Sequence, residues 1–270
     1  MNICICGAAG RMGKRLIACA AEAENLNVTG AVDVPQCLLI GKDSGIASGI
    51  EKNNVLITDD LESACSGADV VIDFALADGI TDRLKIYEKE KVCAVFGTTA
   101  VDEQGKSAIE ITSKNIPIIQ APNFSVGVNL LFDLAKKSAK ILDENYDIEI
   151  IEMHHHHKKD APSGTAVRLV ELVEEARDLK YEEKRIYGRE GNTGARPKGE
   201  IAVHSLRGGD VVGDHTVVFA AEGERIELTH KASSRDTFAK GALRAAQFLA
   251  GKEPGIYTMK DVLEIHSNIR

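Results

Sequence analysis

The chain of 270 residues carries 33 basic and 41 acidic side chains, a formal net charge of −8, and 44% hydrophobic residues. This composition is that of a globular protein with one large or two modest domains, and it excludes a disordered, a collagen-like or a small disulfide-stapled chain. An acidic chain is a poor partner for nucleic acid, because phosphate binding needs a basic face.

We expect a cytoplasmic protein with no membrane partner. No apolar run approaches the roughly 20 residues that span a bilayer, and the first residues lack the basic region and cleavage pattern of a secretory signal. The six cysteines lie between Cys4 and Cys93 and form no C-x-x-C pair. This pattern favours reduced thiols over disulfides or a zinc site.

The first 122 residues alternate short apolar strands with helical patterns. The predicted strands are rich in Val and Ile and lie at Ile3–Cys6, Asn27–Val32, Val55–Ile57, Val70–Phe74, Cys93–Phe96 and Ile116–Gln120. Helical patterns fall between them, at Arg11–Ala23, Leu61–Cys65, Gly79–Glu90 and Asp102–Lys114. Strand–helix–strand repeats imply right-handed crossovers, so we predict an α/β fold with an N-terminal Rossmann-type, doubly wound parallel sheet.

The pattern changes after Pro122-Asn123, and a domain boundary is expected near residue 124. Residues 187–213 are rich in glycine and charge, which predicts a long functional loop. The predicted helices of this part are Val126–Leu142, Gly164–Leu179 and a final helix at Arg235–Leu249. The predicted strands are Ile148–Met153, Ile201–Leu206, His215–Ala221 and Arg225–Ala232. Together these elements predict a C-terminal α+β domain with an open mixed sheet.

A glycine-rich turn indicates a dinucleotide site. Gly7–Gly13 follows the first strand with the spacing G-x-x-G-x-x-G, which lets backbone N–H groups and a helix N-terminus approach a pyrophosphate. Asp33 ends the second strand, where a carboxylate can bind a ribose hydroxyl. Val34 follows it in place of an Arg, and Arg11 is the nearby alternative cation. NADH is therefore favoured, with NADPH open as an alternative; a turn without a ligand is the competing interpretation.

Two further loops follow predicted strands of the same sheet. They are Phe96-Gly97-Thr98-Thr99 and Ala121-Pro122-Asn123-Phe124. Ligands of open α/β sheets bind beyond the carboxyl ends of the strands, so the hydroxyl and amide side chains here could line a nicotinamide. Plain turns are the alternative.

The richest segment for chemistry is Glu152–Ala166, with the sequence EMHHHHKKDAPSGTA. A metal site is disfavoured, because four consecutive histidines at a strand end point to alternate faces and no cysteine or spaced carboxylate completes a ligand set. Instead, histidine can act as a general acid, Lys158 can neutralise a carboxylate, and the helix start at Ser163–Thr165 can hold an anion. This combination predicts an acidic small-molecule substrate, against the alternative of a solvated basic turn. Core or surface roles are expected for His204, His215, His230 and His266.

On these motifs the chain resembles the 4-hydroxy-tetrahydrodipicolinate reductase (dihydrodipicolinate reductase) family of the diaminopimelate route to lysine. The most specific stretch runs from Glu152 through Lys158 to Ala166. Supporting segments are Gly7–Gly13, Gly97–Thr99, Ala121–Phe124, Gly209–His215 and His230–Arg235.

The resemblance implies an NAD(P)H-dependent oxidoreductase that reduces 4-hydroxy-tetrahydrodipicolinate, a cyclic dicarboxylate, to tetrahydrodipicolinate. It implies a dinucleotide-binding domain of residues 1–124 completed by 235–270. Residues 125–234 would then form a substrate-binding domain through which a homotetramer assembles.

By matching positions, the resemblance also implies a set of site residues, with no metal ligand among them. His154 is the implied proton donor and acceptor, Lys158 the implied proton donor, and His155, Gly164 and Thr165 the implied substrate contacts. The implied cofactor-binding residues are Gly7, Ala8, Ala9, Gly10, Arg11, Met12, Asp33, Gly97, Thr98, Thr99, Ala121, Pro122, Asn123 and Phe124. The chain departs from the family at His156, where Arg is frequent, and at Val34, which stands where some members have an Arg.

Two alternatives come from other functional classes. A non-catalytic NAD(H)-binding redox sensor would use its cysteines as the responsive groups, but it leaves the His and Lys segment without a role. A metal-dependent hydrolase would use the four histidines as ligands.

Overall fold

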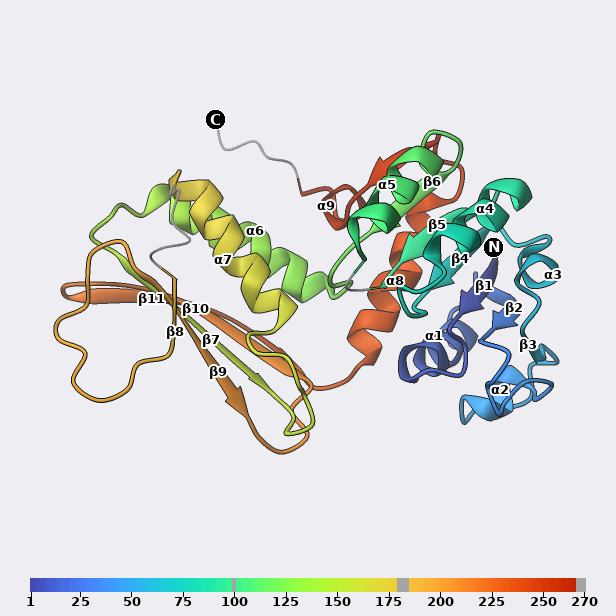
Figure 1. Ribbon diagram of the computed structural model, residues 1–270, viewed down its shortest axis with the longest axis horizontal. Helices are drawn as coiled ribbons and strands as arrows, with labels where there is room; N and C mark the ends of the chain where they lie inside the picture. Colours follow the sequence, from blue (N-terminus) through green and yellow to red (C-terminus); the bar gives the residue numbers. More distant parts are fainter. Residues whose placement is uncertain (99–100, 179–184, 266–270) are drawn as a thin grey trace. The chain divides into compact units, whose positions relative to one another are not determined.

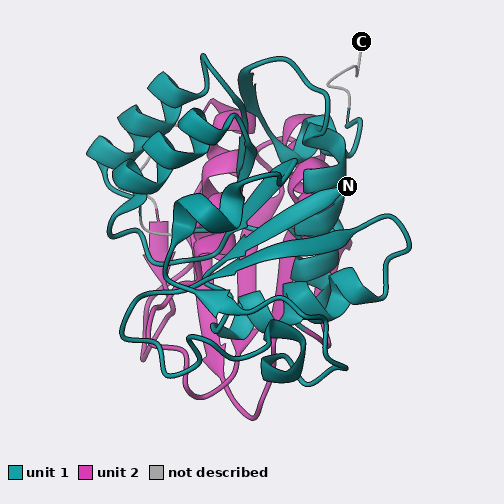
Figure 2. Cartoon of the chain, turned by 90° about the vertical axis from the view of Figure 1, so that its right-hand side faces the viewer, with its two compact units in different colours: residues 1–126, 235–270 teal, residues 127–234 magenta. Residues whose placement is uncertain are grey.

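The computed structural model describes residues 1–98, 101–178 and 185–265. These residues form two compact units (Figure 2). Unit 1 comprises residues 1–126 together with 235–270, and unit 2 comprises residues 127–234. Each unit has a sheet of its own.

Unit 1 contains a seven-stranded sheet in which every pairing is parallel, in the order β12-β6-β5-β4-β1-β2-β3 (Figure 1). The strands are β1 (Asn2–Cys6), β2 (Asn27–Val32), β3 (Ile57–Thr58), β4 (Val70–Asp73), β5 (Cys93–Phe96), β6 (Pro117–Gln120) and β12 (Gly255–Tyr257). The helices are α1 (Arg11–Ala21), α2 (Ser44–Ala47), α3 (Leu61–Cys65), α4 (Ile80–Glu90), α5 (Glu103–Thr112), α8 (Asp236–Leu249) and α9 (Met259–Val262). Six of the strands follow the doubly wound order 3-2-1-4-5-6, which confirms the predicted fold class for this part.

The strands of unit 1 are buried on both faces. In β1, Ile3 and Ile5 pack in one core with residues of α1 and α8, while Cys4 and Cys6 pack in a second core with residues of α4 and α5. Successive side chains of a strand point to opposite faces, so each strand must be apolar on both sides. This is why these segments read as continuous apolar runs.

The chain returns to unit 1 through α8. Arg15 of α1 forms a forked ion pair with Asp236 at the start of α8, with distances of 2.5 and 2.9 Å. A Cβ on Gly241 would lie 1.8 Å from the carbonyl oxygen of Phe124, so only glycine permits this approach of α8. β12 then extends the sheet beyond β6. Helix α8, strand β12 and helix α9 therefore belong to the first unit, and residues of α8 and α9 pack in its core.

Unit 2 contains a five-stranded mixed sheet in the order β11-β10-β7-β9-β8. Its strands are β7 (Asp147–His154), β8 (Arg185–Tyr187), β9 (Ile201–Arg207), β10 (Gly213–Ala221) and β11 (Glu224–Ala232). β10 runs antiparallel to β7 and β11, whereas β7, β9 and β8 are mutually parallel. Helices α6 (Val126–Ile141) and α7 (Gly164–Arg177) cover one face (Figure 1). This sheet confirms the predicted α+β part of the fold.

The structure corrects several predicted elements. The third strand was expected at Val55–Ile57 but is Ile57–Thr58, because Val55 accepts a hydrogen bond from Ser44 N and Leu56 bridges Asp43. The expected loop 187–213 is shorter, since β8 ends at Tyr187 and β9 begins at Ile201. The sequence patterns did not predict α2, β8, β12 or α9, which have at most four residues each. Leu179, the expected end of α7, and His266 lie outside the described residues.

Within the described part of the chain, no helix combines the length and apolar character needed to cross a membrane.

Candidate active site

The glycine turn of unit 1 is built by close backbone packing. Gly7 has a φ of +78°, and a Cβ there would lie 3.0 Å from the backbone nitrogen of Ala75. A Cβ on Gly13 would lie 2.1 Å from Gly7 O, so α1 packs directly on the turn. Gly10 caps α1 without a side-chain hydrogen bond. The N–H groups of the first turn of α1 are therefore available to an anion.

A cavity of about 740 Å³ opens beside this turn. Asp33 lies in its wall, where Oδ2 accepts a hydrogen bond from Ala9 N at 2.8 Å and Oδ1 accepts one from Val34 N at 2.9 Å. Asp33 therefore reaches the cavity and also holds the glycine turn in place. The lining residues are Cys6, Gly7, Ala9, Gly10, Val32, Asp33, Val34, Cys37, Asp59, Leu61, Phe74, Ala75, Leu76, Asp78 and Arg83.

A buried ion pair supports one wall of this cavity. Asp73, at the end of β4, is fully buried and accepts hydrogen bonds from Arg83 Nε at 2.8 Å and the Tyr87 hydroxyl at 3.0 Å. Arg83 also donates to the carbonyl oxygens of Leu76 and Asp78, at 2.9 and 2.7 Å. Burial, reinforced by the Asp73 charge, raises the pKa of Tyr87 well above its ordinary value. This pair was not predicted from the sequence, where its one signal is an acidic residue in an apolar strand.

The loops after β5 and β6 meet the loop after β4. A Cβ on Gly97 would lie 2.2 Å from the Phe74 ring, and the Phe124 ring lies 5.8 Å from that of Phe74 between centroids. Thr98 Oγ1 donates to Ala75 O at 3.0 Å. The predicted loops at Gly97 and Phe124 are thus together at one edge of the sheet, although neither lines the 740 Å³ cavity.

The other predicted cofactor residues differ in exposure. Ala8 and Ala121 are buried, so neither presents its side chain to a ligand. Arg11 and Pro122 are exposed, and Met12 is half-buried. Asn123 Oδ1 accepts a hydrogen bond from Ser125 N at 2.9 Å. Thr99 lies outside the described residues.

In unit 2 the sheet register gathers polar side chains on the face that carries α6 and α7. Glu152 of β7 lies opposite Ser205 of β9 and His215 of β10. His154, two residues further along β7, shares that face and lies opposite Arg207. Three strands therefore bring these residues to one end of the sheet, next to the start of α7.

Glu152 is the centre of this cluster. It is 0% exposed, and its Oε2 lies 2.5 Å from His154 Nδ1. Arg207 donates to both carboxylate oxygens, at 2.8 and 2.9 Å, and Ser163 N donates to Oε1 at 3.1 Å. Burial alone would raise the pKa of Glu152, but hydrogen bonds from His154, Arg207 and Ser205 hold it well below its ordinary value. Glu152 is therefore an ionised carboxylate inside the unit.

His215 is a second buried imidazole in the cluster. It is 3% exposed, its ring lies edge-on to that of His154 with centroids 5.1 Å apart, and its Nε2 lies 3.0 Å from Ser163 Oγ. Burial, followed by the His154 charge, lowers the pKa of His215 to about 3. His215 is therefore neutral. From the sequence, His215 was expected to have a core or surface role, and its position beside His154 was not predicted.

The helix α7 begins at this cluster. Ser163 is its N-cap, and Ser163 Oγ accepts a hydrogen bond from Ala166 N at 3.2 Å. Of the predicted substrate contacts, Gly164 is exposed and Thr165 is half-buried. The first turn of α7 thus starts directly after a residue bonded to Glu152.

Lys158 lies in the loop that joins β7 to α7. Its side chain is 20% exposed, and its Nζ lies 2.8 Å from Asp160 Oδ2. Arg207 Nη2 donates to Asp160 O at 2.7 Å, which connects this loop to the Glu152 cluster. His155 N donates to Val211 O at 2.7 Å. The predicted residues His154, His155 and Lys158 are thus carried by one backbone segment with both ends anchored.

The four consecutive histidines do not converge. His154 is buried, whereas His156 and His157 are exposed and contact each other with tilted rings whose centroids are 3.9 Å apart. His156 Nδ1 lies 2.9 Å from Gly209 O. Across residues 1–98, 101–178 and 185–265, no three histidine, cysteine or acidic side chains are arranged to hold a metal ion.

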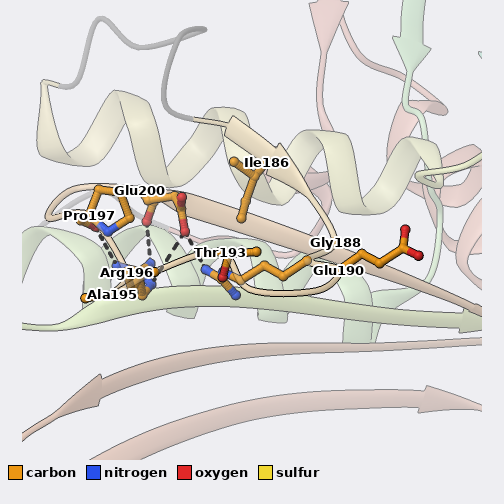
Figure 3. A pocket seen from close by; sticks show the side chains of 10 residues that line it. Ile186, Gly188, Glu190, Thr193, Ala195, Arg196, Pro197 and Glu200 are labelled. Carbon is orange, nitrogen blue, oxygen red and sulfur yellow. Dashed lines mark hydrogen bonds and ion pairs between the residues drawn. The ribbon is translucent and has the colours of Figure 1, made fainter.

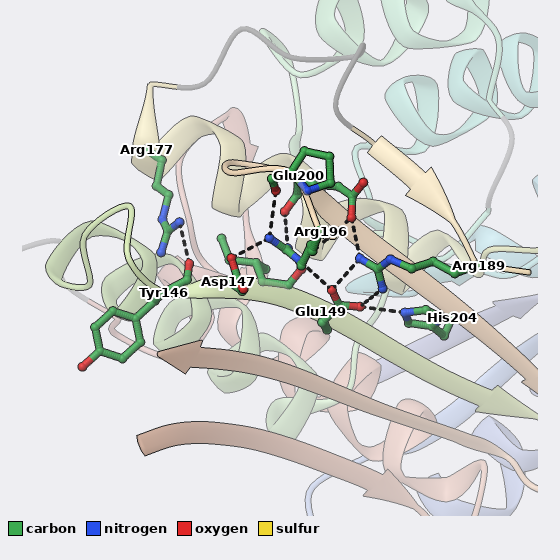
Figure 4. Close-up of polar contacts among 10 residues, drawn as sticks. Tyr146, Asp147, Glu149, Arg177, Arg189, Arg196, Glu200 and His204 are labelled. Carbon is green, nitrogen blue, oxygen red and sulfur yellow. Dashed lines mark hydrogen bonds and ion pairs between the residues drawn. The ribbon is translucent and has the colours of Figure 1, made fainter. Parts of the chain in front are cut away.

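A second polar network holds the loop 188–200 on the opposite face of β7 (Figure 4). Arg196 donates to Asp147 at 2.6 Å and Glu149 at 3.0 Å. Arg189 donates to both oxygens of Glu149 and to Glu200, and His204 Nε2 lies 2.7 Å from Glu149. The loop encloses a cavity of about 510 Å³, lined by both arginines (Figure 3). These guanidinium groups are already paired with carboxylates of the strand and loop.

The two units together define a class of protein. A parallel sheet in doubly wound order, with a glycine turn and an acidic strand end beside a cavity, is the architecture of a dinucleotide-dependent oxidoreductase. The second unit adds a carboxylate–histidine pair next to a lysine and a helix N-terminus.

The family follows from the sequence. Residues 1–124 match the family model for the N-terminus of dihydrodipicolinate reductase, and residues 127–263 match the model for its C-terminus. The chain therefore belongs to the dihydrodipicolinate reductase family, which confirms the resemblance noted from its motifs.

Relatives match over nearly the whole chain. The chain is 49% identical over 266 residues to 4-hydroxy-tetrahydrodipicolinate reductase of Pseudomonas fluorescens (strain Pf0-1), covering 98% of this chain and 99% of the relative. It is 45% identical over 263 residues to the protein of the same name from Syntrophotalea carbinolica, covering 97% and 98%. The structure of dipicolinate-bound dihydrodipicolinate reductase from Paenisporosarcina sp. TG-14 superposes with a TM-score of 0.73 at 22% identity, covering 97% and 98%, which shows the shared fold.

Proposed function

We propose that this chain catalyses the NAD(P)H-dependent reduction of 4-hydroxy-tetrahydrodipicolinate to tetrahydrodipicolinate in lysine biosynthesis through diaminopimelate. The observation that carries the proposal is the buried Glu152–His154 pair beside Lys158 and the start of α7, in a chain that belongs to this reductase family. The substrate is a cyclic dicarboxylate, which matches a site that combines cations with a helix N-terminus.

The residues of unit 1 fit a dinucleotide. The uncapped first turn of α1, with Gly7–Met12, would hold the pyrophosphate, and Asp33 would accept a hydrogen bond from a ribose hydroxyl. Gly97–Thr99 and Ala121–Phe124 would border the nicotinamide. When bound, the reduced cofactor supplies a hydride.

We propose NADH as the favoured form, with NADPH as the alternative. The wall of the cavity carries Asp33, Asp59 and Asp78, and Arg83 is already bonded to Asp73. A 2′-phosphate beside Asp33 would be repelled, and Val34 supplies no compensating cation. Arg11, exposed at the start of α1, is the group that could offset this repulsion.

The residues of unit 2 would bind the substrate and move its proton. The 4-hydroxyl of the substrate must first leave as water, which creates a ring C=C bond conjugated with the C=N bond. Hydride transfer to the ring carbon that lost the hydroxyl then leaves negative charge, and one proton must be added to the neighbouring carbon. We assign Lys158 as the proton donor and His154 as proton donor and acceptor. His155, Gly164 and Thr165 would bind the substrate carboxylates, with the N–H groups at the start of α7 contributing partial positive charge.

We also propose that the protein is a cytoplasmic homotetramer assembled through unit 2. Helices α6 and α7 lie on one face of its sheet, while the opposite face carries Ile151 and Leu206, which are 38% and 44% exposed. Exposed apolar side chains on the part of this face that the loop 188–200 leaves open favour association. Light scattering at micromolar concentration should give the mass of a tetramer, and a monomer would contradict the assembly.

The test of the function is NADH oxidation by the purified protein with 4-hydroxy-tetrahydrodipicolinate, repeated with NADPH. Turnover with either cofactor supports the proposal. Binding of NADH without oxidation would instead indicate a sensor, and hydrolysis abolished by a chelator would indicate a metal-dependent enzyme.

A further inference from the structure

We propose that Glu152, held by Arg207, is a positioning residue that fixes His154 in one tautomer and anchors the Lys158 loop and the start of α7 to that imidazole. The assignment of His154 and Lys158 to substrate chemistry rests on the proposed function. The tautomer itself is a property of the protein without ligand, so it can be tested separately.

Glu152 determines which ring nitrogen of His154 carries the proton. The Glu152 carboxylate is fully buried and accepts two hydrogen bonds from the guanidinium of Arg207. An ionised carboxylate can only accept hydrogen bonds, so His154 Nδ1, at 2.5 Å from Oε2, must donate. In the neutral imidazole the lone pair then lies on Nε2. A carboxylate behind a histidine fixes ring and tautomer in the same way in catalytic triads.

The backbone of Gly213 borders the space beside His154 Nε2. A Cβ on Gly213 would lie 3.0 Å from His154 Nε2, which is hydrogen-bond distance. The missing side chain therefore leaves room next to the reactive nitrogen. His215, edge-on to the same ring, has a pKa of about 3 and adds no positive charge there.

Glu152 and Arg207 also hold the start of α7 and the loop that carries Lys158. Its Oε1 accepts the N–H of Ser163, the N-cap of α7. Arg207 reaches past Glu152 to the carbonyl of Asp160, whose carboxylate pairs with Lys158. One carboxylate and its arginine thus set the positions of the imidazole, the helix start and the lysine loop. Partners that orient metal-bound histidines typically change activity by roughly 10–100-fold when removed, and we expect an effect of the same order here.

The same strand provides a matched control. Glu149 also binds a histidine, His204, and two arginines (Figure 4). It lies an odd number of residues from His154 on β7, so its side chain is on the opposite face of the sheet. Glu149→Gln therefore removes a carboxylate with the same kinds of partner, a histidine and arginines, without touching the proposed site.

The experiment is ¹⁵N NMR of the histidine rings in the ligand-free protein, combined with kinetics. We expect the Nδ1–H tautomer of His154 in the native protein and in Glu149→Gln. Glu152→Gln should lose this preference and lower kcat by roughly 10–100-fold, with NADH affinity unchanged. An Nε2–H tautomer in the native protein, or a Glu152→Gln variant that matches Glu149→Gln in tautomer and kcat, would overturn the proposal.

A second variant covers the case in which Glu152→Gln does not fold because the half-buried Arg207 loses its carboxylate partner. The double substitution Glu152→Gln with Arg207→Gln removes both charges and should show the same loss of tautomer preference. If that variant keeps the Nδ1–H tautomer, Glu152 does not position His154. If the native protein does not oxidise NADH, the proposed function is wrong. The tautomer measurement would still decide whether Glu152 positions His154.

Discussion

Asp33 connects the glycine turn to cofactor choice, and its two roles can be separated by experiment. Its carboxylate accepts hydrogen bonds from the N–H groups of Ala9 and Val34, at 2.8 and 2.9 Å, and lies in the wall of the 740 Å³ cavity. Asp33→Ala removes both backbone contacts, which loosens the turn for any dinucleotide. It also removes the acceptor that we assign to the ribose hydroxyl of NADH, and the charge that would repel the 2′-phosphate of NADPH.

The expected change in cofactor affinity follows from the hydrogen bonds and the charge that Asp33→Ala removes. A hydrogen bond to a charged group contributes about 1.5–3 kcal/mol, or roughly a 10–150-fold change in Kd. The loosened turn weakens both cofactors equally, so it cancels in the ratio of their dissociation constants. We therefore expect Asp33→Ala to shift this ratio toward NADPH by at least about tenfold, on top of any shared loss.

Calorimetric titration of the native and Asp33→Ala proteins with each cofactor measures the four constants. Equal weakening of NADH and NADPH would show that Asp33 acts only through the turn, and the ribose assignment would then be wrong. If the native protein binds NADPH tenfold more tightly than NADH, the proposed preference for NADH is wrong. Tenfold tighter binding means that NADPH is favoured by about 1.4 kcal/mol, although Asp33 should repel its 2′-phosphate.

Three further predictions concern unit 2. In steady-state assays, Lys158→Ala should lower kcat by roughly 10²–10⁴-fold while NADH affinity stays unchanged. The control variant Lys159→Ala, at an exposed neighbour, should lower kcat far less. If Lys158→Ala raises only KM, Lys158 is a carboxylate anchor and not a proton donor. The pKa of Glu149 is about 2 against an ordinary 4.5, because hydrogen bonds from nearby arginines and a histidine outweigh its burial. Its ionised form therefore stabilises the folded state fully above about pH 4.5, and this contribution is lost as the pH falls toward 2. Urea unfolding should show that the free energy of unfolding declines over that pH range, and that it declines less in Glu149→Gln. Equal declines in the two proteins would contradict the assignment. Gly213→Ala places a Cβ 3.0 Å from His154 Nε2, so kcat should fall while NADH binding is kept, and normal turnover would show that no reacting group uses that space.

The sequence alone determined the features that depend on neighbouring residues. The parallel strands of unit 1 are visible because burial on both faces demands apolar runs, and Gly7–Gly13 with Asp33 is visible because strand, turn and helix are consecutive. The segment from Glu152 to Thr165 stands out for the same reason, since its histidines, lysine and helix start lie in one stretch. The family resemblance rested on these contiguous motifs.

The tertiary structure alone decided which distant residues complete each site. Arg207 and His215 lie on other strands, and nothing in their local sequence marks them as partners of Glu152. Strand register places them there, and register depends on long-range pairing. Two similar glutamates of one strand show the reason most clearly: Glu149 and Glu152 differ by three positions, so the pleat sends one to the loop 188–200 and the other to His154.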